Sequence, residues 1–303
     1  MNISKKKLKQ TWQCYLLLTT QLIGLFVFTL YPILWTFKKA FYFYTGVPSE
    51  THFTGMTNFA SLFSDLTYWK TWITTIEFTV IKLLIEFPLA MLMAYFLNKK
   101  IRGRGFFRAL FYLPSIIAVA IVGLMFTNMF DYFGFINAIL CRLKIINEEI
   151  YWLGSFKTSL TVLIAGSIWM GFGVNTLYFI AGLQNIPAEL YECANLEGAG
   201  KFAIFTRITL PLMGPVLQTI ILLGINSTLH VGEYVIVTTN GAPGGQTLSV
   251  IAYQIAKFVP GFMDSADAVN IGYGCAMSLI TSVIMCLIAI SYNKISSKLN
   301  SIY

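Results

Sequence analysis

The sequence predicts an all-α membrane protein with six transmembrane helices. Of its 303 residues, 56% are hydrophobic and only 11% are charged, whereas a soluble domain carries about 25% charged residues. Five uncharged runs each exceed the about 20 residues that a membrane-spanning helix needs; they cover residues 10–37, 109–130, 158–188, 208–232 and 268–293. This composition excludes disorder, a nucleic-acid-binding module and a soluble enzyme as leading interpretations, despite a net charge of +8.

The six spans are expected in one domain that covers residues 1–303, at about 11–37, 71–98, 107–130, 158–184, 212–232 and 268–292. Four lysines within residues 5–9 precede the first span, as in a signal peptide. Its apolar run is longer than the usual about 7–15 residues, and no A-x-A cleavage site follows. We therefore expect an uncleaved helix. The second span is the least uniform, because it contains Glu77, Lys82 and Glu86.

The basic residues predict the orientation of these spans. With the N-terminus inside, 13 of the 21 lysines and arginines lie on the cytoplasmic side and 7 on the outer side, while Lys82 lies within a span. Cytoplasmic loops carry this kind of excess. The sequence therefore predicts a multi-pass protein of a bacterial-type cytoplasmic membrane, with both termini in the cytoplasm.

Motifs for catalysis and for metal binding are missing from the sequence. There is no G-x-x-x-x-G-K-[ST] phosphate loop, no H-E-x-x-H and no G-x-S-x-G. The five cysteines have neither zinc-site spacing nor a disulfide pattern. We expect no enzyme activity, no metal site and no cofactor bound by this chain.

The connection after the fourth span, residues 186–211, differs from a simple loop. Pro187 suits the start of a helix, and residues 188–196 are mostly good helix formers. Gly198 and Gly200 permit a sharp turn, and Gly198 is expected at positive φ. A second short helix follows, and Pro211 is expected to begin the fifth span. This pattern predicts a helix–turn–helix with apolar and charged faces, which is suited to docking a partner.

The same segment resembles the signature loop of permease subunits of binding-protein-dependent ABC importers. That pattern is E-A-A, three residues, G, nine residues, I-x-L-P. The sequence matches every spacing and departs only at Cys193, which replaces an alanine; the matching residues are Glu192, Cys193, Ala194, Gly198, Ile208, Leu210 and Pro211.

Further resemblance to the sugar and glycerol-phosphate branch of this family covers nearly the whole chain. It includes Gly55-Met56-Thr57-Asn58-Phe59, Leu113-Pro114, Leu183-Gln184-Asn185-Ile186-Pro187, Gly241-Ala242-Pro243 and Gly272-Tyr273.

The resemblance implies a type I ABC importer permease fold and a transport mechanism. Such a permease pairs with a second permease, two ATP-binding subunits that hold ATP and Mg²⁺, and an extracytoplasmic solute-binding protein. Residues 186–211 would act as a coupling helix in a cleft of the ATPase. The chain would then form half of the translocation path, for a sugar or related polyol.

Polar residues within the later spans are candidates for contact with the solute, because such groups face the bundle interior or a water-filled cavity. An aromatic ring with amide partners suits a sugar, although each residue could equally form hydrogen bonds between helices. The candidates are Trp169, Asn175, Asn226, Ser227 and His230.

Lys82 and Glu86 lie one turn apart and so share a helix face. Such an intramembrane pair is either part of a functional site or a structural ion pair between spans, and the sequence leaves both open.

Two other classes of membrane protein are alternatives. A secondary transporter would work without an ATPase partner, but six spans without an internal repeat argue against it. A membrane enzyme would need a cluster of His, Asp or Glu at one membrane face. The sequence does not identify the solute, nor whether the second permease is identical or different.

Overall fold

The computed structural model describes residues 2–99, 102–240, 249–258 and 270–300. It divides into two compact units, of which the first comprises Met1–Asp65 with Lys257–Ser282 and the second Leu66–Ala256 with Val283–Tyr303. The predicted Gly241-Ala242-Pro243 turn lies outside the described residues, as do residues 268 and 269 of the sixth predicted span. A single domain over 1–303 stays a prediction.

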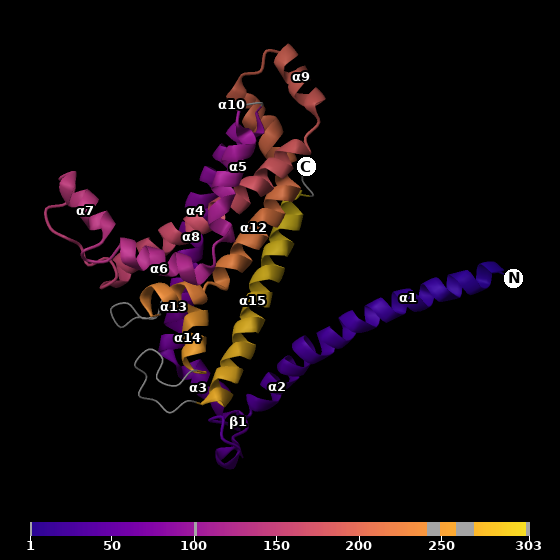
Figure 1. The fold of residues 1–303 in the computed structure, drawn as a ribbon, viewed down its shortest axis with the longest axis vertical. Helices are drawn as coiled ribbons and strands as arrows, with labels where there is room; N and C mark the ends of the chain where they lie inside the picture. Colours follow the sequence, from indigo (N-terminus) through magenta and orange to yellow (C-terminus); the bar gives the residue numbers. More distant parts are fainter. Residues whose placement is uncertain (1, 100–101, 241–248, 259–269, 301–303) are drawn as a thin grey trace. The chain divides into compact units, whose positions relative to one another are not determined.

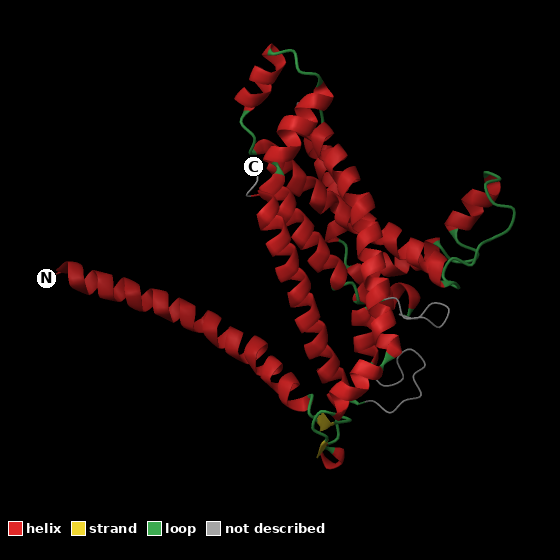
Figure 2. Cartoon of the chain, turned by 180° about the vertical axis from the view of Figure 1, so that it is seen from behind, coloured by secondary structure: helices red, strands yellow, loops and turns green. Residues whose placement is uncertain are grey.

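The first unit begins with a continuous helical run of α1 (Asn2–Leu25), a π-helical turn η1 (Phe26–Leu30) and α2 (Tyr31–Lys39). Then come β1 (Tyr42–Phe43), the 3₁₀ turn η2 (Pro48–Glu50), β2 (His52–Phe53) and α3 (Thr57–Ser64). The two strands pair antiparallel and are the only yellow elements of Figure 2. The unit also contains the first residues of α15 (Ile271–Asn300).

Asn58 holds the loops of the first unit together. Its amide nitrogen donates to the carbonyl oxygens of Ala40 at 2.8 Å and Tyr42 at 3.0 Å. Its own side-chain oxygen accepts from the Asn270 amide at 3.3 Å. Asn58 is buried, so these bonds satisfy groups that would otherwise be left without partners away from water.

The second unit is a helix bundle whose long members are α4 (Leu66–Asn98), α8 (Phe156–Gln184), α12 (Gly214–Leu229) and the end of α15. The shorter helices are α5 (Arg104–Tyr112), α6 (Val119–Met129), α7 (Phe135–Arg142), α9 (Ala188–Leu196), α10 (Lys201–Ile204), α11 (Leu210–Leu212), α13 (Glu233–Thr239) and α14 (Val250–Ala256). The α9 and α10 helices lie at one end of this unit, and α13 and α14 lie toward the other (Figure 1).

Local chemistry explains the ends of the two longest helices of the second unit. The Ser155 hydroxyl accepts from the Thr158 backbone N–H and caps the start of α8. The helix stops shortly before Pro187, because the residue before a proline disfavours the helical conformation. At the end of α4, the Arg108 guanidinium donates to the Leu97 carbonyl oxygen at 3.1 Å, which satisfies a terminal acceptor.

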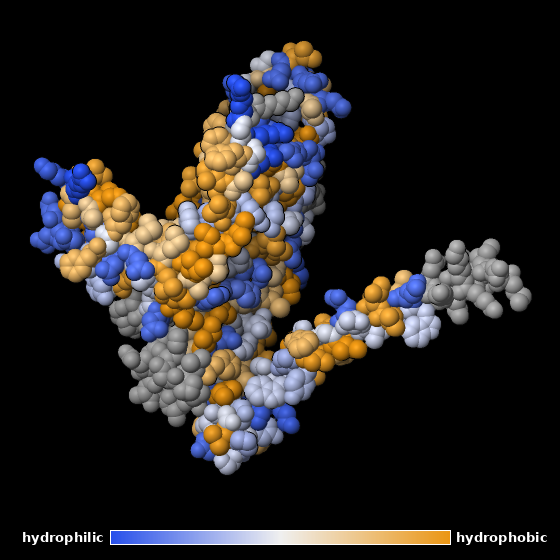
Figure 3. Space-filling model, viewed as in Figure 1, coloured by the Kyte–Doolittle hydropathy of each residue, from blue (hydrophilic) through white to orange (hydrophobic). Residues whose placement is uncertain are grey.

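Apolar residues form the core of the second unit and also much of its surface. Ala90, Ala94, Phe179, Met213 and Ile220 pack together from α4, α8 and α12 and their connections. On the face shown in Figure 3, hydrophobic residues cover the middle of the unit, and hydrophilic residues gather at the α9–α10 end. This distribution suits a bundle whose middle lies in hydrocarbon.

Four helices of the described part are long and apolar enough to cross a membrane, namely Thr11–Lys39, Leu66–Asn98, Phe156–Gln184 and Ile271–Ser297. Two bent pairs raise this number to six if each pair is one span. The pairs are Arg104–Ile116 with Val119–Met129, bent by 92°, and Lys201–Leu212 with Gly214–Leu229, bent by 70°.

The third predicted span, 107–130, is therefore not one continuous helix. The helix passes into a 3₁₀ turn η3 (Leu113–Ile116), and residues Ile117 and Ala118 are extended, with ψ of 136° and 135°. Pro114 lies in this turn and has no N–H to donate to the helix ladder.

The fifth predicted span, 212–232, also differs from the expectation. Pro211 does not begin it, because a continuous helical run from Lys201 through a π-helical turn η4 (Phe205–Thr209) to Leu212 already contains this residue. The bend falls at Met213, directly before Gly214 and Pro215. Pro215 has no N–H to donate to the preceding turn, and its ring would clash with a carbonyl oxygen of that turn. The chain therefore changes direction there.

Candidate functional site

The segment that follows α8 is a compact helix–turn–helix, and Gly198 fixes its turn. The Ala199 N–H bonds to the Ala194 carbonyl oxygen at 2.9 Å, and the Gly198 N–H bonds to that of Asn195 at 3.1 Å. Gly198 has φ of +76°, which confirms the positive φ expected from the sequence. These two bonds with a left-handed residue form a Schellman cap. The turn therefore needs a residue that tolerates the left-handed conformation.

The first helix of this segment, α9, contacts the bundle on one side and is exposed on the other. The Tyr191 hydroxyl lies 3.2 Å from the Thr209 hydroxyl in η4, and Ala194 is buried. Glu192 and Cys193 are exposed. Two large apolar side chains also stand in the open, since Leu196 is 89% exposed and Phe202 80%. An acidic group beside open apolar side chains is a surface that a partner would cover.

The rest of the matched pattern lies in the second arm of this segment. Ile208 is half-buried in η4, Leu210 is exposed and Pro211 is half-buried in α11. The structure thus places all seven predicted residues on α9, its cap and the helical run that leads to α12.

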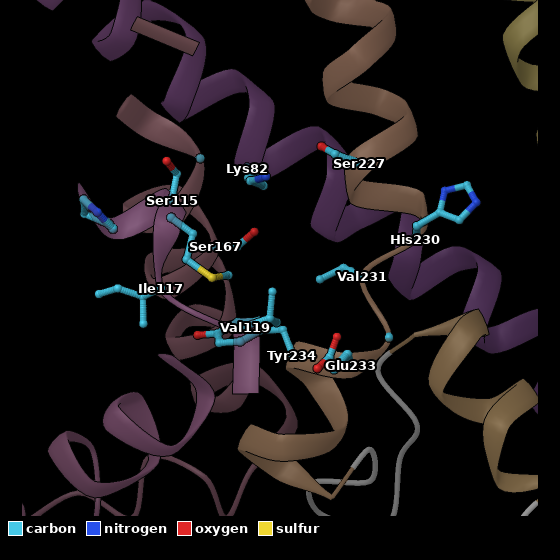
Figure 4. A pocket seen from close by; sticks show the side chains of 14 residues that line it. Lys82, Ser115, Ile117, Val119, Ser167, Ser227, His230, Val231, Glu233 and Tyr234 are labelled. Atoms are coloured by element: carbon cyan, nitrogen blue, oxygen red, sulfur yellow. The ribbon is translucent and has the colours of Figure 1, made fainter. Parts of the chain in front are cut away.

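A cavity of about 290 Å³ lies within the second unit, between α4, α8, α12 and the segments around residues 114–119 and 231–234. Figure 4 shows it from close by: the Ser227 hydroxyl is directed toward the side on which Lys82 lies, and the His230 ring points away. Its polar lining residues are Lys82, Ser115, Ser167, Ser227, His230, Glu233 and Tyr234. The cavity offers hydroxyls, a cation and a carboxylate around an apolar wall, as a site for a small polar solute requires.

Lys82 is held at this cavity by a buried carboxylate. Lys82 Nζ lies 3.4 Å from Glu86 Oε2, and the side chains are 8% and 0% exposed. The Asn175 amide of α8 donates to Glu86 Oε1 at 2.6 Å. A side chain at Gly171 would collide with this carboxylate, so glycine is what lets α8 approach α4 there. The pair, which the sequence placed on one helix, thus also bridges two helices.

The other predicted solute contacts do not line the cavity. Asn175 binds Glu86 behind the wall, and Asn226 is exposed. The Asn226 backbone oxygen accepts a hydrogen bond from His230 Nδ1 at 2.8 Å. Trp169 is 37% exposed and packs against Phe126, with ring centroids 6.0 Å apart. Of the five candidates, the structure brings only Ser227 and His230 to the cavity with Lys82.

Four polar lining residues were not anticipated from the sequence, namely Ser115, Ser167, Glu233 and Tyr234. Ser115 follows the Leu113-Pro114 pair, so a break in the third span could have drawn attention to it. Ser167 lies four residues before Gly171 and eight before Asn175, on the same face of α8. No spacing in the sequence joins Glu233 or Tyr234 to the others.

We predict that Lys82 and Glu86 stabilise the fold because each compensates the buried charge of the other. Removing one partner of a buried ion pair leaves an unpaired charge, which costs about 3–5 kcal/mol. Glu86→Gln and Lys82→Gln should therefore each lower the thermal unfolding temperature and the yield of folded protein in detergent. The double variant should recover much of both, because it buries no charge.

Glu77→Gln is the matched control, since Glu77 is an exposed carboxylate on the same helix. It should leave the unfolding temperature near that of the wild type. A Glu86→Gln variant as stable as Glu77→Gln would contradict the compensation argument.

Comparisons with known proteins identify the family of the chain. The family model for the inner membrane component of binding-protein-dependent transport systems matches residues 86–301. The trehalose/maltose transport system permease protein MalF of Thermococcus litoralis is 30% identical over 293 residues, covering 96% of each chain. The arabinooligosaccharides transport system permease protein AraP of Bacillus subtilis is 28% identical, over 93% of this chain and 88% of that protein.

A crystal structure of a bacterial ABC transporter involved in the import of the acidic polysaccharide alginate contains a chain with a similar fold. The TM-score is 0.79 at 23% identity, covering 97% of this chain and 98% of that one. This likeness confirms the predicted all-α, type I permease fold. With a family match over most of its length, the chain belongs to the inner membrane components of binding-protein-dependent transport systems, and it is a multi-pass membrane permease of an ABC importer.

Proposed function

We propose that the chain forms half of the translocation path of a sugar importer. In this proposal it pairs with a second permease, two ATP-binding subunits and an extracytoplasmic solute-binding protein. The observation that carries the proposal is the open α9 surface, where Glu192 and Cys193 of the matched pattern are exposed beside the Gly198 cap. ATP and Mg²⁺ would bind in the ATPase subunits, since this sequence has no phosphate loop.

The alternative of a secondary transporter without an ATPase partner finds no support in the family match. A similar solved transporter was crystallised in complex with a periplasmic protein that holds an alginate pentasaccharide. That complex supports the solute-binding protein as a partner type, while the number of each subunit follows only from the resemblance.

A sugar or related polyol is the solute class that we infer. The relatives transport trehalose and maltose, and arabinooligosaccharides, according to their names. The cavity adds a physical argument, because its hydroxyls and its charged groups can each exchange hydrogen bonds with sugar hydroxyls. Lys82 is neutralised by Glu86, so the cavity does not present an uncompensated cation.

One hydrogen bond and the chain itself link the α9 surface to the cavity. Tyr191 on α9 contacts Thr209, and the chain continues from Thr209 through α11 to α12, which carries Ser227. We propose that closure of the ATPase subunits pushes on α9 and that this route passes the displacement to α12. The cavity would then open alternately to the two sides of the membrane.

The first test of the proposal concerns coupling. Gly198→Val should strain the left-handed turn by about 1–3 kcal/mol and misdirect α10, and Glu192→Lys should repel a basic or hydrogen-bonding group in the ATPase cleft. Both variants should reach the membrane at near-normal levels yet lose solute uptake. Uptake and ATPase co-purification are measured on the same membranes.

Two substitutions serve as matched controls for coupling. Gly198→Asn should keep uptake, because asparagine tolerates positive φ better than valine. Glu197→Lys makes the same charge change at a position that the matched pattern leaves unspecified, and should also keep uptake. Normal uptake by Gly198→Val and Glu192→Lys would show that this segment does not couple to an ATPase.

The second test concerns the cavity and the solute. Ser227→Phe should fill the cavity and abolish most uptake of labelled maltose, trehalose or arabinooligosaccharide, whichever the transporter accepts, while ATPase co-purification stays normal. Asn226→Phe is the control, because Asn226 precedes Ser227 in the same helix and does not line the cavity. Uptake of labelled glutamine but of none of these sugars would contradict the solute class.

The third test concerns orientation in the membrane. Both termini are expected in the cytoplasm from the distribution of basic residues. A fluorescent protein fused after residue 303 should fluoresce, and alkaline phosphatase fused there should be inactive. The same two reporters fused after Asp131 should give the reverse. An active phosphatase at the C-terminus would contradict the proposed orientation.

A further inference from the structure

A second hollow in this unit is separate from the cavity, although Phe202 and Leu210 of the proposed docking segment also line it. It is an open apolar groove of about 800 Å³ between one side of α4 and the segment that runs from α10 to α12. Its lining residues are Phe87, Pro88, Met91, Leu92, Tyr95, Lys99, Phe179, Lys201, Phe202, Phe205, Leu210, Leu217 and Ile221. Apart from the Tyr95 hydroxyl, the two lysines supply its only polar side chains.

The two lysines lie at the same end of the groove. The Tyr95 and Phe205 rings meet edge to face at 6.3 Å, which brings the last turn of α4 beside the helical run that starts at Lys201. At the opposite end, a side chain on Gly224 of α12 would meet the Phe87 ring. Lys99 follows Tyr95 by one helical turn, and Lys201 precedes Phe205 by one turn. Both cations therefore lie at one end of the groove, while aromatic and aliphatic side chains line the other end.

Among the residues that the structure describes, neither lysine forms an ion pair with a carboxylate. Lys99 instead lies over the Tyr95 ring, with Nζ 4.4 Å from the ring centroid. A ring face holds an ammonium in place by cation–π attraction and leaves its charge available to an anion. This end of the groove is therefore positively charged, and the Tyr95 ring holds the Lys99 ammonium in place there.

The length of the groove matches one leaflet of a membrane. From Phe87 to Lys99 along α4 is about 18 Å at 1.5 Å per residue, and half of a bilayer's hydrocarbon core is about 15 Å. A transmembrane helix from a partner would need an apolar surface across both leaflets. One apolar tail with an anionic group at its end fits the groove in length and in charge.

From this geometry we propose that the groove binds an anionic phospholipid. An acyl chain lies along Met91, Leu92 and Phe205, and the phosphate group contacts the ammonium groups of Lys99 and Lys201. The site touches α10, which follows the Gly198 turn, so the lipid stabilises the position of this segment against α4. The proposal is independent of which solute the cavity accepts.

The test measures bound lipid directly. The complete transporter is reconstituted in vesicles of equal parts phosphatidylglycerol and phosphatidylcholine, extracted again in mild detergent, and its retained lipids are quantified by mass spectrometry. The wild type should retain phosphatidylglycerol in excess over phosphatidylcholine. Each of Lys99→Gln and Lys201→Gln should lower that excess about fivefold, since an anionic surface attracts each nearby lysine by a similar factor.

Two further variants separate the apolar groove from general charge. Leu92→Trp narrows the groove without changing charge and should reduce retention of both lipids. Arg207→Gln removes an exposed cation nearby that does not line the groove, and should retain phosphatidylglycerol as the wild type does.

Two results would overturn the proposal. One is equal phosphatidylglycerol retention by the wild type and by the Lys99→Gln/Lys201→Gln double variant. The other is efficient disulfide crosslinking of Leu92→Cys to a second permease subunit carrying introduced cysteines, which would show that a protein helix fills the groove. Neither result depends on solute uptake. Failure of this proposal can therefore be distinguished from failure of the proposed transport function.

Discussion

The fully buried carboxylate of Glu86 constrains how the second unit packs. A charge in a low-dielectric interior must have close partners, and Glu86 finds them on its own helix and on α8. For the Asn175 amide to reach Glu86, the two helices must approach closely. Gly171, one turn away, leaves room for this approach because it has no side chain. Ser167, Gly171 and Asn175 form a stripe along α8 whose first two members line the cavity. The same close approach thus holds the ion pair and forms one cavity wall.

The segment that we propose docks a partner depends on that packing through a second set of contacts. Met213 is fully buried among Ala90, Phe179 and Ile220, so the bend between α11 and α12 is held in the core. The Tyr191–Thr209 contact joins α9 to the near side of this bend. In the proposed mechanism, a displacement of α9 would reach α12 through this connection, since close-packed interiors transmit displacement.

The two hollows of this unit differ in how their charges are treated. In the cavity, the ammonium of Lys82 is paired with Glu86, and the lining also contains serine hydroxyls and the Glu233 carboxylate. In the groove, Lys99 lies over the Tyr95 ring and Lys201 is also part of the lining, and neither forms an ion pair with a carboxylate among the described residues. A polar solute without a negative charge suits the first environment, and an amphiphilic anion suits the second. Electrostatics thus assigns different ligand chemistry to two spaces that share α4 and α12.

The sequence by itself determined the features that depend on local chemistry. Apolar runs long enough to span a membrane predicted a helical membrane protein. The fixed spacing from Glu192 to Pro211 indicated the family. The positive φ of Gly198 was also predictable, because a turn between two short helices leaves few alternatives. Lys82 and Glu86 were recognisable as a pair since residues four apart share a helix face.

Tertiary structure alone decided which polar residues meet. Asn226 and Ser227 are neighbours in the sequence, yet only Ser227 lines the cavity, because the rotation of α12 is set by packing against α4 and α8. Asn175 was expected at the solute and instead binds Glu86, 89 residues away. The breaks at residues 117–118 and at Met213 likewise follow from how prolines are accommodated in a packed bundle. A sequence records which side chains share a helix face, but the direction of that face is fixed only when the helices pack.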